Sequence, residues 1–121
     1  MGKRALVVDD SDTMRQVIGF TLKSAGFDVT EACNGKQALD CLEQGPFNVI
    51  ITDLNMPVMD GVTFIAQARK HDAHKFSPIL MLTTESQESK RQQGKAAGAT
   101  AWLVKPFDPD KLMMVISKVV R

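Results

Sequence analysis

The chain has 121 residues, 44% of them hydrophobic and 24% charged, which is long enough for one domain with a buried core and ordinary for a soluble globular protein. Its net charge of +1 gives no field strong enough to hold nucleic acid or a membrane surface by itself. It has no apolar run of membrane-spanning length and no signal-peptide core, and Cys33 and Cys41 match neither a redox pair nor a metal knuckle, so we expect a cytoplasmic protein.

The first half of the chain alternates short apolar runs with amphipathic helical patterns. The predicted elements are, in chain order, a strand at 4–8, a helix that begins at a Ser11 or Asp12 cap and ends at Gly26, a strand at 28–32, a helix at 36–44 and a strand at 49–52. The strand at 28–32 has few apolar side chains, which indicates an edge of the sheet. The run at 49–51 is β-branched and apolar throughout, as is typical of a strand buried on both faces.

The second half of the chain continues this alternation. The predicted elements are a helix at 62–70 capped by Asp60, a polar connection at 71–77, a strand at 78–82, a helix at 86–97, a strand at 101–104 and a last helix that begins at Asp108-Pro109. The helix at 86–97 is strongly polar and has Gly94 in its interior. Because such a helix gains little from burial, we expect it to be the least stable element.

Two groups of residues in this half are interpreted as facing solvent. Lys90, Arg91 and Lys95 form a basic stripe on the helix at 86–97, which favours a solvated face, although such a stripe could also meet an acidic partner. His71 and His74 lie in the polar connection with no third ligand nearby, which favours solvated side chains over a metal pair.

The count of five strands alternating with five helices, joined by short connections, predicts one α/β domain over residues 1–121. Right-handed crossovers then require a parallel sheet that is covered by helices on both faces. We expect a flavodoxin-like, doubly wound (βα)5 fold with strand order 2-1-3-4-5, which places the first and third strands side by side.

Acidic residues come directly after these two neighbouring strands. Asp9 and Asp10 follow the first strand and Asp53 follows the third, so all three would project into one small volume. Two like charges about 4 Å apart repel by roughly 4 kcal/mol at an effective dielectric near 20, so the cluster needs a cation or protons. A few rim-exposed oxygen ligands suit Mg²⁺. Asp53 could instead cap the next helix, but Asp60 lies nearer to the start of that helix.

The fourth and fifth strands bring two further polar groups to the same edge. Thr83 supplies a hydroxyl and Lys105 an ammonium, and either group could bind a phosphoryl oxygen. Each residue alone has a simple structural explanation, but all of them at the ends of successive strands indicate a phosphate-handling site.

Four motifs together resemble the response-regulator receiver domain family. They are VVDDS at 7–11, DLNMPVMDG at 53–61, LTTE at 82–85 and KPF at 105–107. The resemblance covers the whole chain and is nearest to the stand-alone, CheY-like type that acts in chemotaxis, because of VVDDSDTMR at the start and GATAWLVKPF near the end.

The resemblance implies a role for each of the site residues. Asp53 would be the phosphoacceptor, attacking a phosphohistidine on a CheA-like histidine kinase. Mg²⁺ would be held by Asp10 directly, by Asp9 largely through water, by Asp53, and by the backbone carbonyl of Asn55. Lys105 would neutralise the phosphoryl group.

The resemblance also implies a switch. Thr83 would move to hydrogen-bond the phosphoryl group, Trp102 would follow by turning inward, and the peptide bond before Pro106 would be cis. Many family members have Tyr or Phe at the position of Trp102, so the larger indole is a departure that bears on how far the ring can turn.

Two further residues would set the lifetime of the acyl phosphate, and a third departs from the family pattern. Asn55 and Glu85 occupy the positions that tune this lifetime in the family. Thr84 stands where a smaller residue is common, and its bulk would narrow the access to Asp53.

The function that follows is that of a signalling phosphoacceptor rather than an enzyme. Phosphorylation would switch the face formed by residues 86–97, 101–104 and the last helix, which would bind a flagellar motor switch protein or another target, with a phosphatase as a possible further partner. Because the last helix ends close to Arg121, we expect no output domain. With a net charge of only +1, we also expect no direct binding to nucleic acid or a membrane.

Three alternatives remain at the level of sequence. The chain could be the excised receiver of a longer regulator. A Mg²⁺-dependent phosphatase with Asp53 as nucleophile would need a second acid two residues later, where Asn55 stands. An FMN-binding flavodoxin-like protein would need a Ser/Thr/Gly-rich phosphate loop after the first strand, where Asp9 and Asp10 would repel phosphate.

Overall fold

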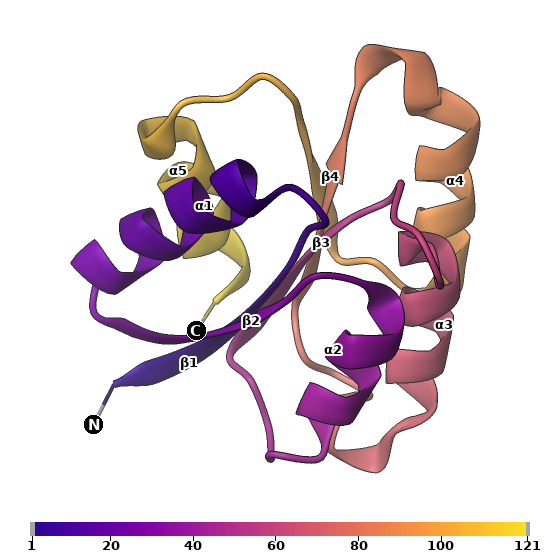
Figure 1. Ribbon diagram of the computed structural model, residues 1–121, viewed down its shortest axis with the longest axis horizontal. Coiled ribbons are helices and arrows are strands. Elements are labelled where there is room, and N and C mark those ends of the chain that lie inside the picture. The colour runs from indigo at the N-terminus through magenta and orange to yellow at the C-terminus, as the bar shows by residue number, and fades with distance from the viewer. Residues whose placement is uncertain (1, 121) are drawn as a thin grey trace.

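The computed structural model describes residues 2–120, except for the side chain of Glu85, and its central feature is one parallel sheet of five strands (Figure 1). The strands are β1 (Lys3–Val8), β2 (Phe27–Ala32), β3 (Val49–Asp53), β4 (Ile79–Thr83) and β5 (Ala101–Val104). Their order is β2-β1-β3-β4-β5, which confirms the predicted flavodoxin-like topology and the edge position of β2.

Five helices cover the two faces of this sheet (Figure 1). They are α1 (Asp12–Ser24), α2 (Gly35–Leu42), α3 (Gly61–Lys70), α4 (Glu88–Ala97) and α5 (Pro109–Val119), with short 3-10 turns η1 (Asp72–His74) and η2 (Glu85–Gln87). Helices α1 and α5 lie on one face, and α2, α3 and α4 lie on the other. Within residues 2–120, no helix is long and apolar enough to cross a membrane.

Helix starts follow the capping residues in the sequence. The side chains of Ser11, Asp60 and Asp108 accept hydrogen bonds from backbone N–H groups in the first turns of α1, α3 and α5. Pro109 occupies the first turn of α5, where its fixed φ suits the helix and its missing N–H is not needed.

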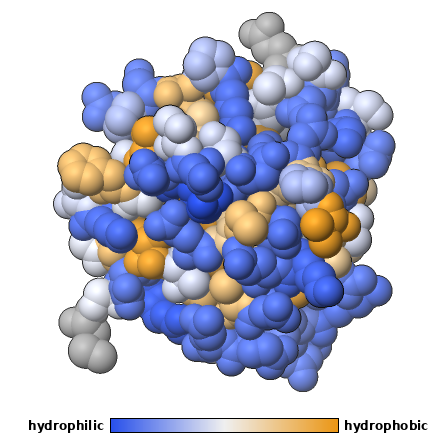
Figure 2. All heavy atoms as spheres, in the orientation of Figure 1, coloured by the Kyte–Doolittle hydropathy of each residue, from blue (hydrophilic) through white to orange (hydrophobic). Residues whose placement is uncertain are grey.

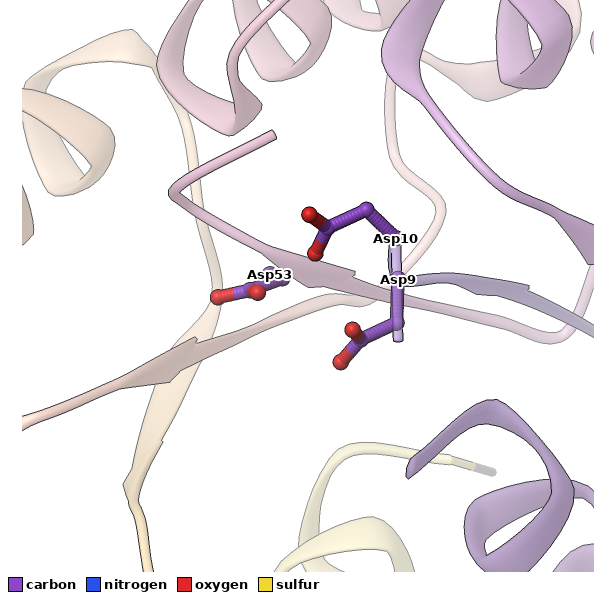
Figure 3. Close-up of side chains that lie close together, drawn as sticks. All are labelled: Asp9, Asp10 and Asp53. Carbon is purple, nitrogen blue, oxygen red and sulfur yellow. The ribbon is translucent and has the colours of Figure 1, made fainter. Parts of the chain in front are cut away.

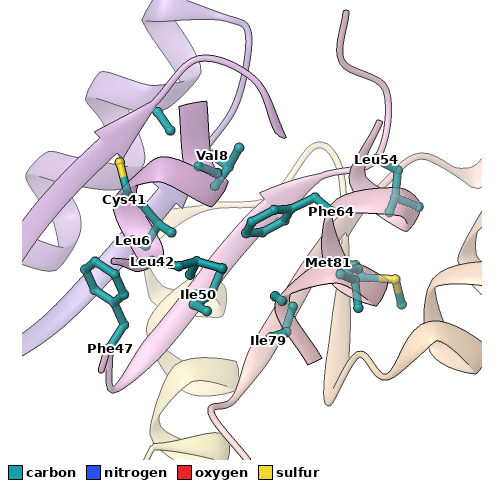
Figure 4. Packing of buried hydrophobic residues seen from close by; sticks show 14 residues of the cluster. Leu6, Val8, Cys41, Leu42, Phe47, Ile50, Leu54, Phe64, Ile79 and Met81 are labelled. Carbon is teal, nitrogen blue, oxygen red and sulfur yellow. The ribbon is translucent and has the colours of Figure 1, made fainter. Parts of the chain in front are cut away.

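Strands β1 and β3 carry continuous apolar runs, at 5–8 and 49–51, which are buried on both faces of the sheet. Leu6, Val8 and Ile50 belong to the core cluster beneath α2 and α3, part of which is drawn in Figure 4. Their neighbours Val7 and Ile51 belong to the second cluster, beneath α1 and α5. Successive side chains of a strand point to opposite faces, so a continuous apolar run feeds both cores. The surface drawn in Figure 2 is mostly hydrophilic, with separated apolar spots.

Gly94 is the one residue of α4 that is buried. A Cβ at this position would overlap the side chain of Met81 in β4, so the glycine lets a polar helix lie directly against the sheet. The residue that lowers the helix propensity of α4 is therefore the one that allows it to pack.

The prediction that His71 and His74 are solvated is wrong for His74, which is fully buried. Its ring stacks on Phe47 with the centroids 5.9 Å apart, its Nε2 lies 3.2 Å from the carbonyl oxygen of Leu42, and its Nδ1 lies 3.4 Å from Ser77 Oγ. The carbonyl can only accept, so Nε2 carries a proton, and burial lowers the pKa of His74, which favours the neutral ring. His71 is half-buried.

Candidate functional site

Three carboxylates meet at the carboxyl ends of β1 and β3. Val8 pairs with Thr52 in the sheet, so Asp9, Asp10 and Asp53 leave adjacent strands at the same level. One oxygen from each carboxylate lies within 4.8 Å of the others, and Figure 3 shows the three groups facing a common space. The sequence prediction that these residues come together is confirmed.

Their environments differ in solvent access and in hydrogen bonding. Asp9 is fully buried, Asp53 is nearly so and Asp10 is exposed. The backbone N–H of Ser11 donates to Asp9 Oδ1 at 2.9 Å, and that of Leu54 donates to Asp53 Oδ1 at 2.8 Å. These bonds fix the direction of each carboxylate and leave the second oxygen of each free to meet a cation.

Lys105 is the cation that the fold itself supplies. Its Nζ lies 3.3 Å from Asp53 Oδ2 and 3.4 Å from Asp9 Oδ2, while its side chain stays mostly covered. The cis peptide bond between Lys105 and Pro106, which the family resemblance implied, follows β5 at this edge. One ammonium contacts two of the three carboxylates, so the cluster carries an excess of negative charge.

Burial raises the pKa of the Asp53 carboxyl, the positive charge of Lys105 opposes that rise, and the neighbouring Asp9 adds to it. The site therefore favours either a proton on Asp53 or a bound cation. An all-oxygen donor set with two buried members and one exposed member fits Mg²⁺, which keeps several of its waters.

Thr83 ends β4 at the same edge, beside Val104 in the sheet register. Its hydroxyl is buried and has no hydrogen-bond partner within residues 2–120. Leaving such a group unpaired costs about 1–3 kcal/mol, so an unpaired buried hydroxyl calls for an explanation. The hydroxyl is a donor at the edge where the carboxylates converge.

A groove of about 270 Å³ connects Thr83 to Trp102 on β5. It is lined by Thr83, Thr84, Glu88, Arg91, Trp102 and Val104. Trp102 is 41% exposed, so its indole is neither in the core nor fully in water.

Two residues of the basic stripe on α4 contact other elements, whereas the sequence favoured a solvated face. Lys90 Nζ donates to Asn55 Oδ1 at 3.0 Å, and Arg91 lies over the Trp102 ring, 4.5 Å from its centroid. Lys95 is exposed, as expected. The contacts of Lys90 and Arg91 join α4 to the loop after β3 and to β5, which a pattern within one helix cannot reveal. The side chain of Glu85, the other predicted lifetime-tuning residue, lies outside the part that the structure describes.

The comparisons with known sequences agree with this geometry. Residues 5–117 match the family described as the response regulator receiver domain. The transcriptional regulatory protein SrrA of Staphylococcus aureus is 33% identical over 121 residues, which are the whole of this chain and 49% of SrrA. The chain thus spans about half the length of the curated relatives that it matches.

Solved structures show the same architecture. The chemotaxis response regulator CheY4 of Vibrio cholerae superposes with a TM-score of 0.93 at 47% identity, over 99% of this chain and 100% of that chain. The receiver domain of a sensor histidine kinase from Pseudomonas aeruginosa, with a magnesium ion coordinated in its active-site cleft, gives a TM-score of 0.90 at 28% identity, over 98% of both chains. Both matches span the strands that carry the carboxylates.

Proposed function

The chain belongs to the family of response regulator receiver domains, and from this premise we propose that it is a phosphorylation-controlled binding module with Asp53 as its phosphoacceptor. Receiver domains take a phosphoryl group from a histidine kinase. The observation that carries the assignment is the convergence of three carboxylates and Lys105 at one edge of the sheet. We treat residues 1–121 as one receiver domain.

In the proposed reaction, Asp53 Oδ2 attacks the phosphorus of a phosphohistidine. An O–P bond forms, the N–P bond breaks, and the bonding pair leaves with the imidazole of the kinase. Phosphoryl transfer needs positioning and charge neutralisation more than covalent assistance. The Leu54 N–H holds the other oxygen of Asp53, which aims Oδ2 toward the space that Lys105 faces.

Asp10, Asp53 and the backbone carbonyl of Asn55 would hold Mg²⁺, with Asp9 acting largely through water. When bound, Mg²⁺ would offset the excess of negative charge and neutralise charge on the transferring group. Lys105 would then pair with a phosphoryl oxygen, and the Thr83 hydroxyl would find there the acceptor that it lacks among the described residues.

The output that we propose is a change in the face made by α4, β5 and α5. Thr83 and Trp102 line the same groove, so movement of the hydroxyl toward the phosphoryl group opens room for the indole to turn. The similarity to a Vibrio cholerae chemotaxis regulator favours a CheA-like kinase as donor and a flagellar motor switch protein as target. The same site would operate if the chain were the receiver of a longer regulator.

The test uses Trp102, the single tryptophan, as a reporter. Its fluorescence is followed while Mg²⁺ and then beryllofluoride, a phosphoryl mimic, are added to the wild type and to Asp53→Ala. A Mg²⁺-dependent change in the wild type that is absent from Asp53→Ala supports the proposal. Failure of the wild type to bind Mg²⁺ or beryllofluoride would overturn it.

A further inference from the structure

The contact between α4 and the half-exposed indole involves more than packing. The Arg91 guanidinium carbon lies 4.5 Å from the centroid of the Trp102 ring, within the distance at which a cation is attracted to an aromatic face. Glu88 Oε1 lies 3.6 Å from Arg91 Nη2, so the same guanidinium is anchored one helical turn away. The Arg91 side chain is only 22% exposed, which makes the attraction to the ring less screened than on an open surface.

The groove lies directly beside this pair, between Trp102 and the unpaired Thr83 hydroxyl. Arg91 and Glu88 form its helical wall, and Trp102 and Val104 form its strand wall. An indole that turned into the groove toward Thr83 would leave the position in which Arg91 lies over its face. The stacked contact, as the structure shows it, belongs to the half-exposed arrangement of the ring.

We propose that Arg91 is a latch: by stacking on Trp102 and pairing with Glu88, it holds the indole half-exposed and opposes the phosphorylated state. This inference rests on the proposed function, and it assigns to Arg91 a positioning role in the switch. A contact that is made in only one of two states shifts the equilibrium toward that state by its full free energy. Removing Arg91 should therefore make the activated state easier to reach, whereas ordinary damage to the fold would make it harder.

The experiment compares the wild type with Arg91→Ala and with Lys95→Ala, which removes the same charge from an exposed position of the same helix. Fluorine NMR of bound beryllofluoride in the presence of Mg²⁺ gives the affinity, and acrylamide quenching of Trp102 without beryllofluoride gives the exposure of the ring. We expect Arg91→Ala to bind beryllofluoride about two- to fivefold more tightly and to show reduced quenching. Lys95→Ala should match the wild type in both measurements.

Two outcomes would overturn the latch. If quenching of Arg91→Ala rises while its affinity for beryllofluoride stays at the wild-type value, Arg91 only covers the ring. If the affinity falls, Arg91 supports the activated state instead. Either result would leave the proposed function standing, provided that the wild type binds beryllofluoride and Asp53→Ala does not.

A second variant keeps the test valid if Arg91→Ala folds poorly. Glu88→Gln keeps the guanidinium but removes its anchoring charge, so it should tighten beryllofluoride binding in the same direction and by a smaller factor. Arg91→Lys keeps the charge but loses the planar stacking surface, so we expect its affinity to fall between those of the wild type and Arg91→Ala. Wild-type affinity in both variants would also contradict the latch.

Discussion

The two ends of the sheet differ in how far their polar groups are paired. At the carboxyl end, Asp9 and Asp53 share one ammonium and Thr83 has an unpaired buried hydroxyl. At the amino end of β4 and β5, Arg69 donates to the carbonyl oxygens of Gly98, His74, Lys75 and Ser77 and to Thr100 Oγ1. Buried polar groups cost free energy unless they are paired. Among the described residues the amino end leaves His71 Nδ1 unpaired but satisfies many carbonyls through Arg69, whereas the carboxyl end leaves the Thr83 hydroxyl unpaired beside an incompletely neutralised set of carboxylates.

The largest effect should come from the amino end, where Arg69 ties together the connections that precede β4 and β5. Arg69→Ala would remove five hydrogen bonds and leave part-buried carbonyls unsatisfied. We expect the free energy of unfolding to fall by about 3 kcal/mol, measured by urea denaturation. Lys70→Ala, at the exposed neighbouring position, should change it by less than about 0.5 kcal/mol. A loss under about 1 kcal/mol for Arg69→Ala would contradict the contrast between the two ends.

The next largest effect concerns His74, which is fully buried at the same end. His74→Ala would leave a cavity beside Phe47 and remove the partner of the Leu42 carbonyl, and it should cost about 2 kcal/mol.

The protonation of His74 also makes the stability of the fold depend on pH. Burial lowers the pKa of His74, so the unfolded chain binds the proton more readily than the folded one. The stabilisation is fully present above the ordinary histidine pKa of about 6.5 and is lost as the pH falls below it toward the folded pKa. Urea midpoints at pH 7.5 and 5.5 should differ more for the wild type than for His74→Gln. Equal differences in the two proteins would exclude His74 as the source.

The two ends also differ in how far the sequence reveals them. The carboxyl end was predictable because parallel topology turns a position in the chain into a position in space: residues after strands one, three, four and five must share an edge. The burial of His74 was not predictable, because it depends on contacts with Leu42 and Phe47, about thirty residues earlier in the chain. Nothing in the sequence of 71–77 indicates those contacts. The position of Arg91 over Trp102 was missed for the same reason, since it joins two elements that are each polar or half-exposed on their own.

A smaller effect, of opposite sign, should come from the carboxyl end. The pKa of Asp53 is raised by burial, so its charged form is disfavoured in the folded chain, and stability falls as the pH rises from the ordinary aspartate pKa of about 3.9 through the folded pKa. Without Mg²⁺ at pH 7, Asp53→Asn should therefore be more stable than the wild type by about 1 kcal/mol in urea denaturation.

Adding Mg²⁺ would sharpen this prediction. A cation that neutralises the carboxylates should stabilise the wild type more than Asp53→Asn. The difference between their free energies of unfolding should therefore narrow or reverse. Asp40→Asn, which removes a carboxylate from the exposed side of α2, should show neither effect. If Asp53→Asn were the less stable protein without Mg²⁺, burial would not disfavour the charged form of Asp53 in the folded chain.

The smallest effect on stability should come from Thr83. A single substitution there tests separately whether the hydroxyl matters for stability and for switching. Replacing the unpaired hydroxyl by a methyl group in Thr83→Val removes a buried polar group that no residue in 2–120 satisfies, so the free energy of unfolding should stay the same or rise by up to about 1 kcal/mol. The same variant can no longer donate to a phosphoryl oxygen. It should still bind beryllofluoride through Asp53 and Lys105 but lose most of the fluorescence change of Trp102, because Thr83 and Trp102 line the same groove.

Thr52→Val, near the end of β3, is the control variant. The Thr52 hydroxyl donates to the Asp53 carbonyl, so the loss of that bond should destabilise the fold. A Thr83→Val protein that is clearly destabilised, or one with a full Trp102 response, would mean that the buried hydroxyl is an ordinary structural group and that the carboxyl end is less specialised than its geometry indicates.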